Sequence, residues 1–388
     1  MLTFLKNAAK AFAMPGSSNV IVSGNEACDL DSLVSAVSLA RLLTLKHNSS
    51  CFVPLVAVPR IEFGLRTDCM AALKEAYPVN HVLIEQALVF LDSSSSFSNL
   101  PTRLILTDHN IPSLSLKQRF NNSFSVVGIV DHHKDELLHT SCEFMRIINP
   151  VGSATSLVTN LYSEYSLAHH IDAPFAKLLL SPILLDTVNL DPASGRVTRQ
   201  DSDAYDFLMS VILKEDPSFT SNSLFESLQK AKFDTSHLTC MELLRRDYKQ
   251  TSCGKGVVGR KLELGISSVG SCFEDLVLRE GGSVDRVDAV TQEFLAEKGL
   301  DIFMVMTAFE VDGAFNRELV VFVKDGSGHE RLFVDLEAHS DLKLVRNPLS
   351  YESKGREIRW YSVQNLKMSR KVVQPILLPM IEHLLCNI

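Results

Sequence analysis

The sequence predicts a two-domain α/β protein, in which a mainly parallel-sheet domain precedes a smaller α+β domain. In the first half of the 388 residues, apolar strand patterns alternate with helical patterns, which is typical of a parallel sheet. The second half instead has successive strand patterns and one terminal helical pattern. The chain is also too long for one simple core. We expect domains at residues 1–215 and 222–388.

The elements of the first domain are expected in a regular order. A first helix ends before Pro15-Gly16, and "NVIVS" (19–23) forms a buried strand. Leu33, Ala36, Val37, Ala40 and Leu43 recur at helical spacing, and 51–59 is a strand candidate interrupted by Pro54. Segment 81–91 is ambiguous, 93–101 is a loop, 103–110 and 124–133 are strands, and 152–165 and 173–190 are helices, the last with Pro182 inside.

The second domain is expected to mix strands and helices without alternation. Residues 222–250 fit one or two helices with a charged end, "LLRRDYKQ", while "KLELGISSVG" and "DIFMVMTAFEV" fit strands. "RELVVFVKDGSGHERLFVDL" fits a strand, a Gly-rich turn and a strand, and "SRKVVQPILLPMIEHLL" fits a terminal helix.

Composition excludes several classes of protein. The chain is 46% hydrophobic and 22% charged, with a net charge of −8 and no long basic run, so sequence-wide nucleic-acid binding is not expected. No apolar stretch reaches the roughly 18 residues that span a bilayer. The eight scattered cysteines have no CxxC spacing, which indicates free thiols and a cytoplasmic location. An organellar pool stays open because residues 1–18 lack acids, and the absence of heptads favours a monomer.

Acidic and histidine side chains follow several of the predicted strands. Asp29 and Asp31 follow the first strand, Asp108 a later one, and Asp131-His132-His133 another. Because ligands bind at the carboxyl ends of strands in open parallel sheets, these side chains are expected to converge. Each aspartate alone is more often a turn former or helix cap. Together they would repel one another unless divalent cations such as Mg²⁺, Mn²⁺, Co²⁺ or Zn²⁺ were bound.

Five segments resemble the motifs of one family. "GNEACDLDS" (24–32), "LTDHN" (106–110), "VDHHKDE" (130–136) and "ILLDT" (183–187) resemble, in order, the four motifs of the DHH phosphoesterase superfamily. "SRKVVQ" (369–374) is similar to the signature of the DHHA2 domain, found in family II pyrophosphatases, prune-type proteins and eukaryotic cytosolic exopolyphosphatases. The resemblance implies a DHH domain, a DHHA2 domain and an active site in the cleft between them.

The branch of the family is indicated by Asn25, where family II pyrophosphatases carry His. Asn25 and the segments 58–68, 243–250 and 262–268 resemble the yeast-type exopolyphosphatases. The implied activity is metal-dependent hydrolysis of the terminal phosphate of inorganic polyphosphate, which releases orthophosphate. A pyrophosphatase or short-chain polyphosphatase, a prune-type cyclic nucleotide phosphodiesterase and a degenerate, non-enzymatic binding protein stay open as alternatives.

The resemblance also implies a set of site residues. Asn25, Asp29 and Asp108 would hold one divalent metal ion, and Asp31, Asp108, His132 and Asp186 a second, with a water activated between them. Mg²⁺ is expected because an amide oxygen is a hard ligand, with Mn²⁺ or Co²⁺ as alternatives. Asp31, Asp108 and His133 are the expected catalytic residues.

The substrate contacts are expected from both domains. His133 would face the phosphate and protonate the leaving group, and Asp131 would orient one imidazole of the motif. Lys249, Arg370 and Lys371 would bind phosphate oxygens, with Arg66 as a further contact. "GSATS" (152–156) could offer backbone N–H groups of a helix start to the same cluster, and plain helix capping is the favoured interpretation.

Overall fold

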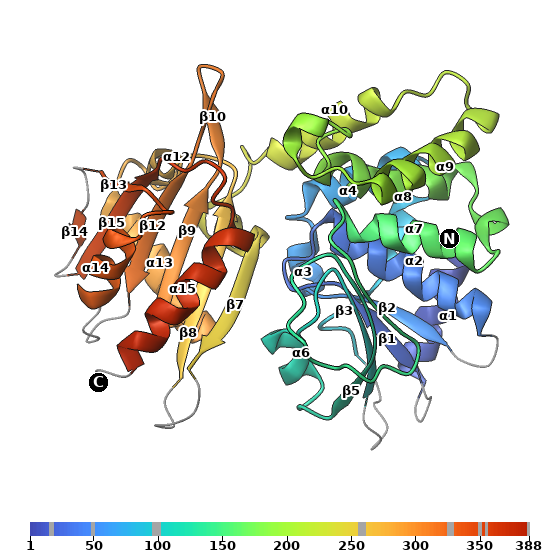
Figure 1. The fold of residues 1–388 in the computed structure, drawn as a ribbon, viewed down its shortest axis with the longest axis horizontal. Coiled ribbons are helices and arrows are strands. Elements are labelled where there is room, and N and C mark those ends of the chain that lie inside the picture. The colour runs from blue at the N-terminus through green and yellow to red at the C-terminus, as the bar shows by residue number, and fades with distance from the viewer. Residues whose placement is uncertain are drawn as a thin grey trace. The chain divides into compact units, whose positions relative to one another are not determined.

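The computed structural model describes residues 1–14, 19–47, 51–94, 102–254, 261–323, 330–347, 351–353 and 356–385. The chain forms two compact units, Met1–Asp234 and Thr235–Ile388 (Figure 1). This division lies later than the junction at 215–222 expected from the sequence. The reason is that α10 (Ser221–Phe233) packs against α4 (Thr67–Ala76) and α8 (Ala173–Asp186) of the first unit.

The first unit is built on a six-stranded sheet with the order β3-β2-β1-β4-β5-β6. The strands are β1 (Val20–Ser23), β2 (Phe52–Val56), β3 (Val89–Phe90), β4 (Thr102–Thr107), β5 (Phe124–Asp131) and β6 (Met145–Ile148). All pairs within it are parallel, which confirms the predicted fold class. Because the strand order reverses between β1 and β4, the loops that follow β1, β4 and β5 meet at the carboxyl edge of the sheet.

Side chains alternate between two cores on the faces of this sheet. Val20 and Val22 face a core shared with α2 (Leu30–Lys46), α7 (Ala154–Glu164) and α8, whereas Ile21 faces α1 (Leu2–Ala13) and α6 (Leu114–Arg119). α2 is buried along most of its length because it contacts β1 and β2 on one side and α7 and α8 on the other. The amino end of α2 is thereby fixed beside the loops that follow the strands.

The remaining elements of the first unit resolve the ambiguous patterns. Segment 81–91 contains both a helix, α5 (His81–Gln86), and the strand β3. Pro54 lies inside β2 and Pro182 inside α8. The unit also contains α3 (Arg60–Phe63), α9 (Arg199–Glu215) and two short 3₁₀ turns at Ala168–His170 and Pro192–Ser194. Of the expected 93–101 loop, residues 95–101 lie outside the described residues, as do Pro15, Gly16 and Cys386.

The second unit contains a mixed sheet with the order β13-β15-β12-β9-β8-β7, in which β8 and β9 are parallel and the other pairs antiparallel. Its strands are β7 (Tyr248–Cys253), β8 (Leu262–Val269), β9 (Ile302–Thr307), β12 (Glu318–Val323), β13 (Leu344–Arg346) and β15 (Arg356–Val363). β14 (Tyr351–Ser353) pairs with β15, and β10 (Phe309–Val311) forms a hairpin with β11 (Ala314–Asn316). The predicted α+β class of this domain is confirmed.

Helices cover both faces of the second sheet. α14 (Glu330–Ala338) and α15 (Arg370–Leu385) share one core with it, while Phe273 of α12 (Phe273–Arg279) and Phe294 of α13 (Val284–Lys298) pack on Phe303 and Phe322 at the other face (Figure 1). α11 (Cys240–Arg246) precedes β7. No helix among the described residues is both long and apolar enough to cross a membrane.

Two secondary-structure predictions in this unit are wrong. The segment "ERLFVDL" is the helix α14 and not a strand, because Leu332, Phe333 and Leu336 lie at helical spacing and face the core. The "YKQ" end of the predicted helix at 222–250 is the start of β7, which pairs with β8. The sequence also did not indicate α12 or α13.

Candidate metal centre

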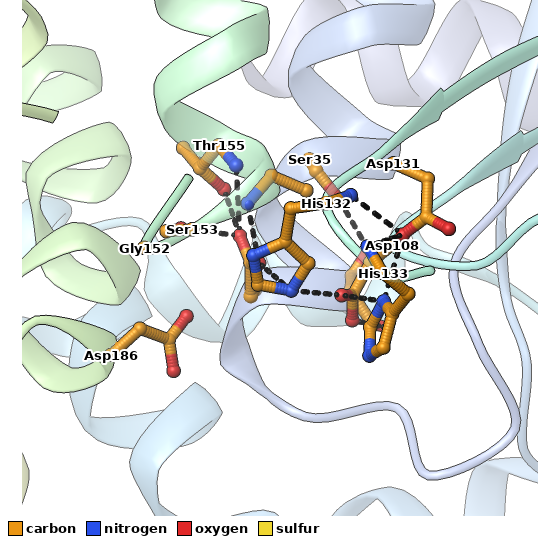
Figure 2. Close-up of polar contacts among 12 residues, drawn as sticks. Ser35, Asp108, Asp131, His132, His133, Gly152, Ser153, Thr155 and Asp186 are labelled. Atoms are coloured by element: carbon orange, nitrogen blue, oxygen red, sulfur yellow. Dashed lines mark hydrogen bonds and ion pairs between the residues drawn. The ribbon is translucent and has the colours of Figure 1, made fainter. Parts of the chain in front are cut away.

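The loops that follow β4 and β5 bring Asp108 together with both imidazoles of the Asp-His-His motif. Nε2 of His132 lies 3.1 Å from Oδ1 of Asp108, and Nδ1 of His133 lies 3.6 Å from the same oxygen. The two rings are nearly perpendicular, at an interplanar angle of 83° (Figure 2). Asp108 is 2% exposed and has a φ of 59°, a left-handed conformation that is uncommon outside glycine and is often found at functional sites. The carboxylate of Asp108 is therefore the centre of the group.

Hydrogen bonds fix the orientation of each imidazole. Nδ1 of His132 lies 3.0 Å from the carbonyl oxygen of Val151. Because a carbonyl only accepts, Nδ1 carries the proton and Nε2 faces Asp108. Nδ1 of His133 lies 2.8 Å from Oδ1 of Asp131. The imidazole that Asp131 orients is thus that of His133.

Asp131 is a fully buried carboxylate enclosed by donors. Oδ1 accepts hydrogen bonds from the backbone N–H groups of His132 and His133, and Oδ2 accepts one from Nδ2 of Asn110 at 2.6 Å. Burial acts to raise the pKa of Asp131, but the hydrogen bond and charge of His133 outweigh it and hold that pKa below its ordinary value. Asp131 therefore stays ionised and keeps a negative charge behind His133.

The loop after β1 and the first turn of α2 each supply one donor to the other oxygen of Asp108. Nδ2 of Asn25 lies 2.6 Å and Oγ of Ser32 2.7 Å from Oδ2 of Asp108, while Oδ1 of Asn25 accepts from the N–H of Ala27. Gly24 is required here because a Cβ would lie 2.6 Å from the carbonyl oxygen of Ser32. Asn25 thus presents its amide N–H to Asp108, which differs from the oxygen-ligand role expected for it.

Asp31 lies beside His132 and is held by the amino end of α7. It accepts hydrogen bonds from Oγ of Ser153, the N–H of Ala154, and both the N–H and Oγ1 of Thr155, at 2.6–2.9 Å. Oδ2 of Asp31 is 3.9 Å from Nε2 of His132. Positive helix ends and backbone donors stabilise the charge of Asp31.

The other two expected metal ligands are placed differently. Asp29 is the N-cap of α2, where its Oδ1 accepts from the N–H of Ser32 at 3.0 Å. Asp186 is the last residue of α8 and lies, in Figure 2, on the opposite side of His132 from Asp108. The structure therefore brings Asn25, Asp31, Asp108, His132 and His133 together, while Asp29 begins α2 and Asp186 ends α8.

The donor set fits a divalent cation. Ligand atoms of Asp108, His132 and His133 all lie within 4.8 Å of one another, and the carboxylate of Asp31 adjoins them. Carboxylate and imidazole ligands together suit Mn²⁺, Co²⁺ or Zn²⁺, and carboxylates suit Mg²⁺. Nδ1 of His132 and Nδ1 of His133 are each bonded to an oxygen. Metal-binding histidines typically have such a hydrogen bond at the ring nitrogen that does not face the metal.

Several supporting residues were not anticipated as parts of the site. Ser32, Asn110, Ser153 and Thr155 all donate to its carboxylates. Asn110 and Ser32 do lie inside the quoted motifs. For "GSATS", the structure agrees with the alternative to plain capping, because the N–H groups of Ala154 and Thr155 bond Asp31.

Arg66 is buried and its guanidinium bonds backbone carbonyl groups. It is 2% exposed and donates to the carbonyl oxygens of Ala27 and Glu62. These contacts stabilise the loop that carries Asn25 and Asp29. This placement gives no support to the expected contact between Arg66 and substrate.

In the second unit, the expected phosphate-binding cations lie on two neighbouring elements. Lys249 is on β7, and Arg370 and Lys371 begin α15, which contacts β7. Arg370 forms a forked contact with Asp247, 2.7 Å to its carbonyl oxygen and 2.6 Å to Oδ1. The guanidinium is thereby held in a defined orientation.

Comparisons with known proteins agree with the motifs. Residues 19–183 match the DHH family, N-terminal domain, and residues 226–380 match the DHHA2 domain. Exopolyphosphatase PRUNE1 of Bos taurus is 31% identical over 367 residues, covering 92% of this chain and 74% of the relative. A Schizosaccharomyces pombe protein assigned as an exopolyphosphatase is 29% identical over 399 aligned positions, covering 98% of this chain and 94% of the relative.

A solved structure with the same fold agrees with the matched domains. The crystal structure of a Methanococcus jannaschii protein assigned to the family II inorganic pyrophosphatases aligns with a TM-score of 0.55 at 19% identity, covering 94% of this chain and 98% of that one. Together with the two matched domains and the relatives, this confirms the family predicted from the motifs. The chain belongs to the DHH family, among those members that carry a DHHA2 domain.

Proposed function

We propose that this chain is an exopolyphosphatase, which hydrolyses the terminal phosphoanhydride bond of inorganic polyphosphate and releases orthophosphate. The observation that carries the proposal is the buried group of Asp108, His132 and His133 at the carboxyl edge of the sheet. It occurs in a chain whose relatives are named exopolyphosphatases.

The proposed metal-binding residues are Asp31, Asp108 and His132, with Asn25 and Ser32 orienting Asp108. Asp29 and Asp186 are proposed to complete a two-metal set, with Mg²⁺ as the working ion. A bound divalent ion supplies positive charge to the phosphoryl oxygens and lowers the pKa of the attacking water. Phosphoryl transfer depends mainly on positioning and charge neutralisation, and the fixed side chains around Asp108 provide the positioning.

His133 is the proposed acid that protonates the leaving phosphate. Its Nδ1 is held by ionised Asp131, so Nε2 is the nitrogen that exchanges a proton with the substrate. Asp131 thus acts through His133 and need not touch the substrate.

Lys249, Arg370 and Lys371 are the proposed phosphate-binding residues of the DHHA2 unit. Arg gives forked contacts to phosphate oxygens and Lys supplies a point charge. The chain has a net charge of −8, so a polyanion needs such local cations as well as metal ions to bind. We further propose a cytoplasmic location, from the scattered spacing of the cysteines.

The test is orthophosphate release with Mg²⁺ from four substrates at equal concentration: pyrophosphate, tripolyphosphate, long-chain polyphosphate and cyclic AMP. The wild type is compared with Asp108→Ala and with Asp172→Asn, a matched control because Asp172 caps α8 at a distance from the group. The proposal expects release from tripolyphosphate and longer chains, loss in Asp108→Ala, and retention in Asp172→Asn. Dominant turnover of pyrophosphate or cyclic AMP, or equal activity in Asp108→Ala, would contradict it.

A further inference from the structure

The segment Val151–Ser156, between β6 and the first turn of α7, holds two side chains of the site at once. The carbonyl oxygen of Val151 accepts a hydrogen bond from Nδ1 of His132 at 3.0 Å. The next residues but one, Ser153, Ala154 and Thr155, donate hydrogen bonds to the carboxylate of Asp31. Any displacement of this segment would therefore move both the imidazole of His132 and the carboxylate of Asp31.

The segment is itself held by a carboxylate that belongs to no motif of the family. Asp201 lies in the first turn of α9 and is fully buried. Its Oδ1 accepts from Oγ of Ser156 at 2.6 Å and from the N–H of Ser153 at 3.4 Å, and its Oδ2 accepts from the N–H of Gly152 at 2.9 Å. One buried carboxylate thus accepts three hydrogen bonds from this segment, two from backbone N–H groups and one from a hydroxyl.

Capping of its own helix accounts for only part of these contacts. Within α9, Oδ2 of Asp201 accepts from the N–H and Oγ1 of Thr198, which forms a capping box. The capping box uses only Oδ2, one of the two carboxylate oxygens of Asp201. Oδ1 of Asp201 instead accepts from Ser153 and Ser156 of the Val151–Ser156 segment. Burying an ionised carboxylate is costly unless donors surround it.

Gly152 is what allows the close approach. A Cβ on Gly152 would lie 3.1 Å from Oδ2 of Asp201 and 2.5 Å from Cγ2 of Thr187, the residue after Asp186. The segment is therefore packed between α9 and the end of α8, which carries Asp186, another proposed metal ligand. Its position depends on both helices.

We infer that Asp201 is a positioning residue of the metal centre, which acts by fixing Val151–Ser156 and, through it, Asp31 and His132. The inference rests on the proposed function, because it takes Asp31 and His132 to be metal ligands. Losing a side chain that orients a metal ligand typically weakens metal affinity by roughly 10- to 100-fold. The same loss is expected of Asp201→Asn, since an amide presents N–H groups to one set of these donors.

The experiment measures the dissociation constant of Mn²⁺ by electron paramagnetic resonance of the free ion. The variants are Asp201→Asn and the milder Ser156→Ala, which removes one hydroxyl donor and keeps the inference testable if Asp201→Asn does not fold. Thr198→Ala is the matched control, because it breaks the capping box and leaves the contacts to Gly152, Ser153 and Ser156 in place. Asp31→Ala is the positive control.

The expected result is a Kd raised about 10- to 100-fold in Asp201→Asn, raised less in Ser156→Ala and near the wild-type value in Thr198→Ala. Phosphate release from tripolyphosphate by Asp201→Asn should recover at high Mn²⁺. The inference alone would be overturned if Asp201→Asn and Ser156→Ala both kept the wild-type Kd while Asp31→Ala lost Mn²⁺. It would also be overturned if Thr198→Ala raised the Kd as much as Asp201→Asn, or if Asp201→Asn did not recover phosphate release at high Mn²⁺. A wild type that binds no Mn²⁺ and releases no phosphate would overturn the proposed function with it.

Discussion

Nδ1 of His133 lies 2.8 Å from Oδ1 of Asp131, and the same oxygen also accepts the backbone N–H of His133. The imidazole is therefore fixed both in rotation and in tautomer by one buried carboxylate. A general acid held in this way can present only Nε2 to a leaving group.

Asp131→Asn is expected to reduce kcat for tripolyphosphate by roughly 100-fold or more, the range of a lost general acid. The neutral amide replaces the carboxylate that accepts both the N–H and Nδ1–H of His133, so the imidazole is held less firmly. Steady-state kinetics measure kcat and KM. An unchanged kcat would remove Asp131 from the mechanism, and Asp172→Asn serves as the control for unspecific damage.

Chelation with EDTA followed by metal addition is expected to abolish and then restore phosphate release, with Mg²⁺ at least as effective as Mn²⁺. The reason is that the carboxylates of Asp31 and Asp108 offer hard oxygen ligands, which suit Mg²⁺. Asn25→His introduces an imidazole and should shift the ratio of kcat/KM toward Mn²⁺ or Co²⁺. If Mg²⁺ gives no turnover where Mn²⁺ does, the predicted metal is wrong.

Arg370→Lys is expected to raise KM for tripolyphosphate about tenfold with a smaller change in kcat. A hydrogen bond to a charged group contributes about 1.5–3 kcal/mol, and Lys cannot reproduce the fork of a guanidinium that Asp247 holds in place. Arg359→Lys, at the Arg359–Glu337 pair of the same unit, is the matched control. Equal KM values for both variants would argue against a substrate contact at Arg370.

Gly152→Ala is expected to destabilise the first unit by about 1–3 kcal/mol, because the new methyl group overpacks against Cγ2 of Thr187. Thr187→Ser removes that methyl and keeps a hydroxyl for the carbonyl oxygen of Ile183. The double variant should therefore recover part of the loss, in a double-mutant cycle followed by thermal unfolding. Strictly additive effects would show that the two positions do not meet.

Glu318 gives a pH-dependent prediction for the second unit. Burial raises its pKa above the ordinary value of 4.5, although the N–H of Phe273 and the hydroxyl of Thr307 act in the opposite direction. A raised carboxyl pKa means that the folded state binds the proton more tightly. Its contribution to stability is thus complete below pH 4.5 and is lost as pH rises through the folded pKa.

Glu318→Gln removes this dependence and should gain thermal stability relative to the wild type as pH increases from 4 to 8. Trp360, the only tryptophan of the chain, lies buried in this unit, so its fluorescence reports the unfolding of the second unit. The exposed Glu293→Gln is the control. A difference in Tm that stays constant across this pH range would contradict the assignment.

The strand-end residues were predictable because their placement depends on local patterns and one rule of topology. Asp108 and His132 follow apolar strands, and β4 and β5 are adjacent and parallel, so their loops meet. The twofold alternation of Val20, Ile21 and Val22 between two cores also follows from a sheet covered on both faces.

The supporting residues were not predictable because their partners are distant along the chain. Asp201 bonds Gly152 across 49 residues, and nothing in either neighbourhood indicates the pairing. Arg66 resembles a substrate contact by residue type, yet its burial depends on how the loop at Ala27 folds over it. The segment "ERLFVDL" fits both a short strand and a helix until the sheet that it covers is known.

The hydrogen bonds of Asp31 have a consequence for biosynthesis. Its donors lie 122–124 residues later in the chain, and Asp201, which holds those donors, comes later still. A nascent chain that has not reached Asp201 carries the early aspartates without the helix end that stabilises them. The ribosome must therefore complete nearly the whole first unit before a metal ion meets an organised site, and fragments that end before α9 should emerge without one.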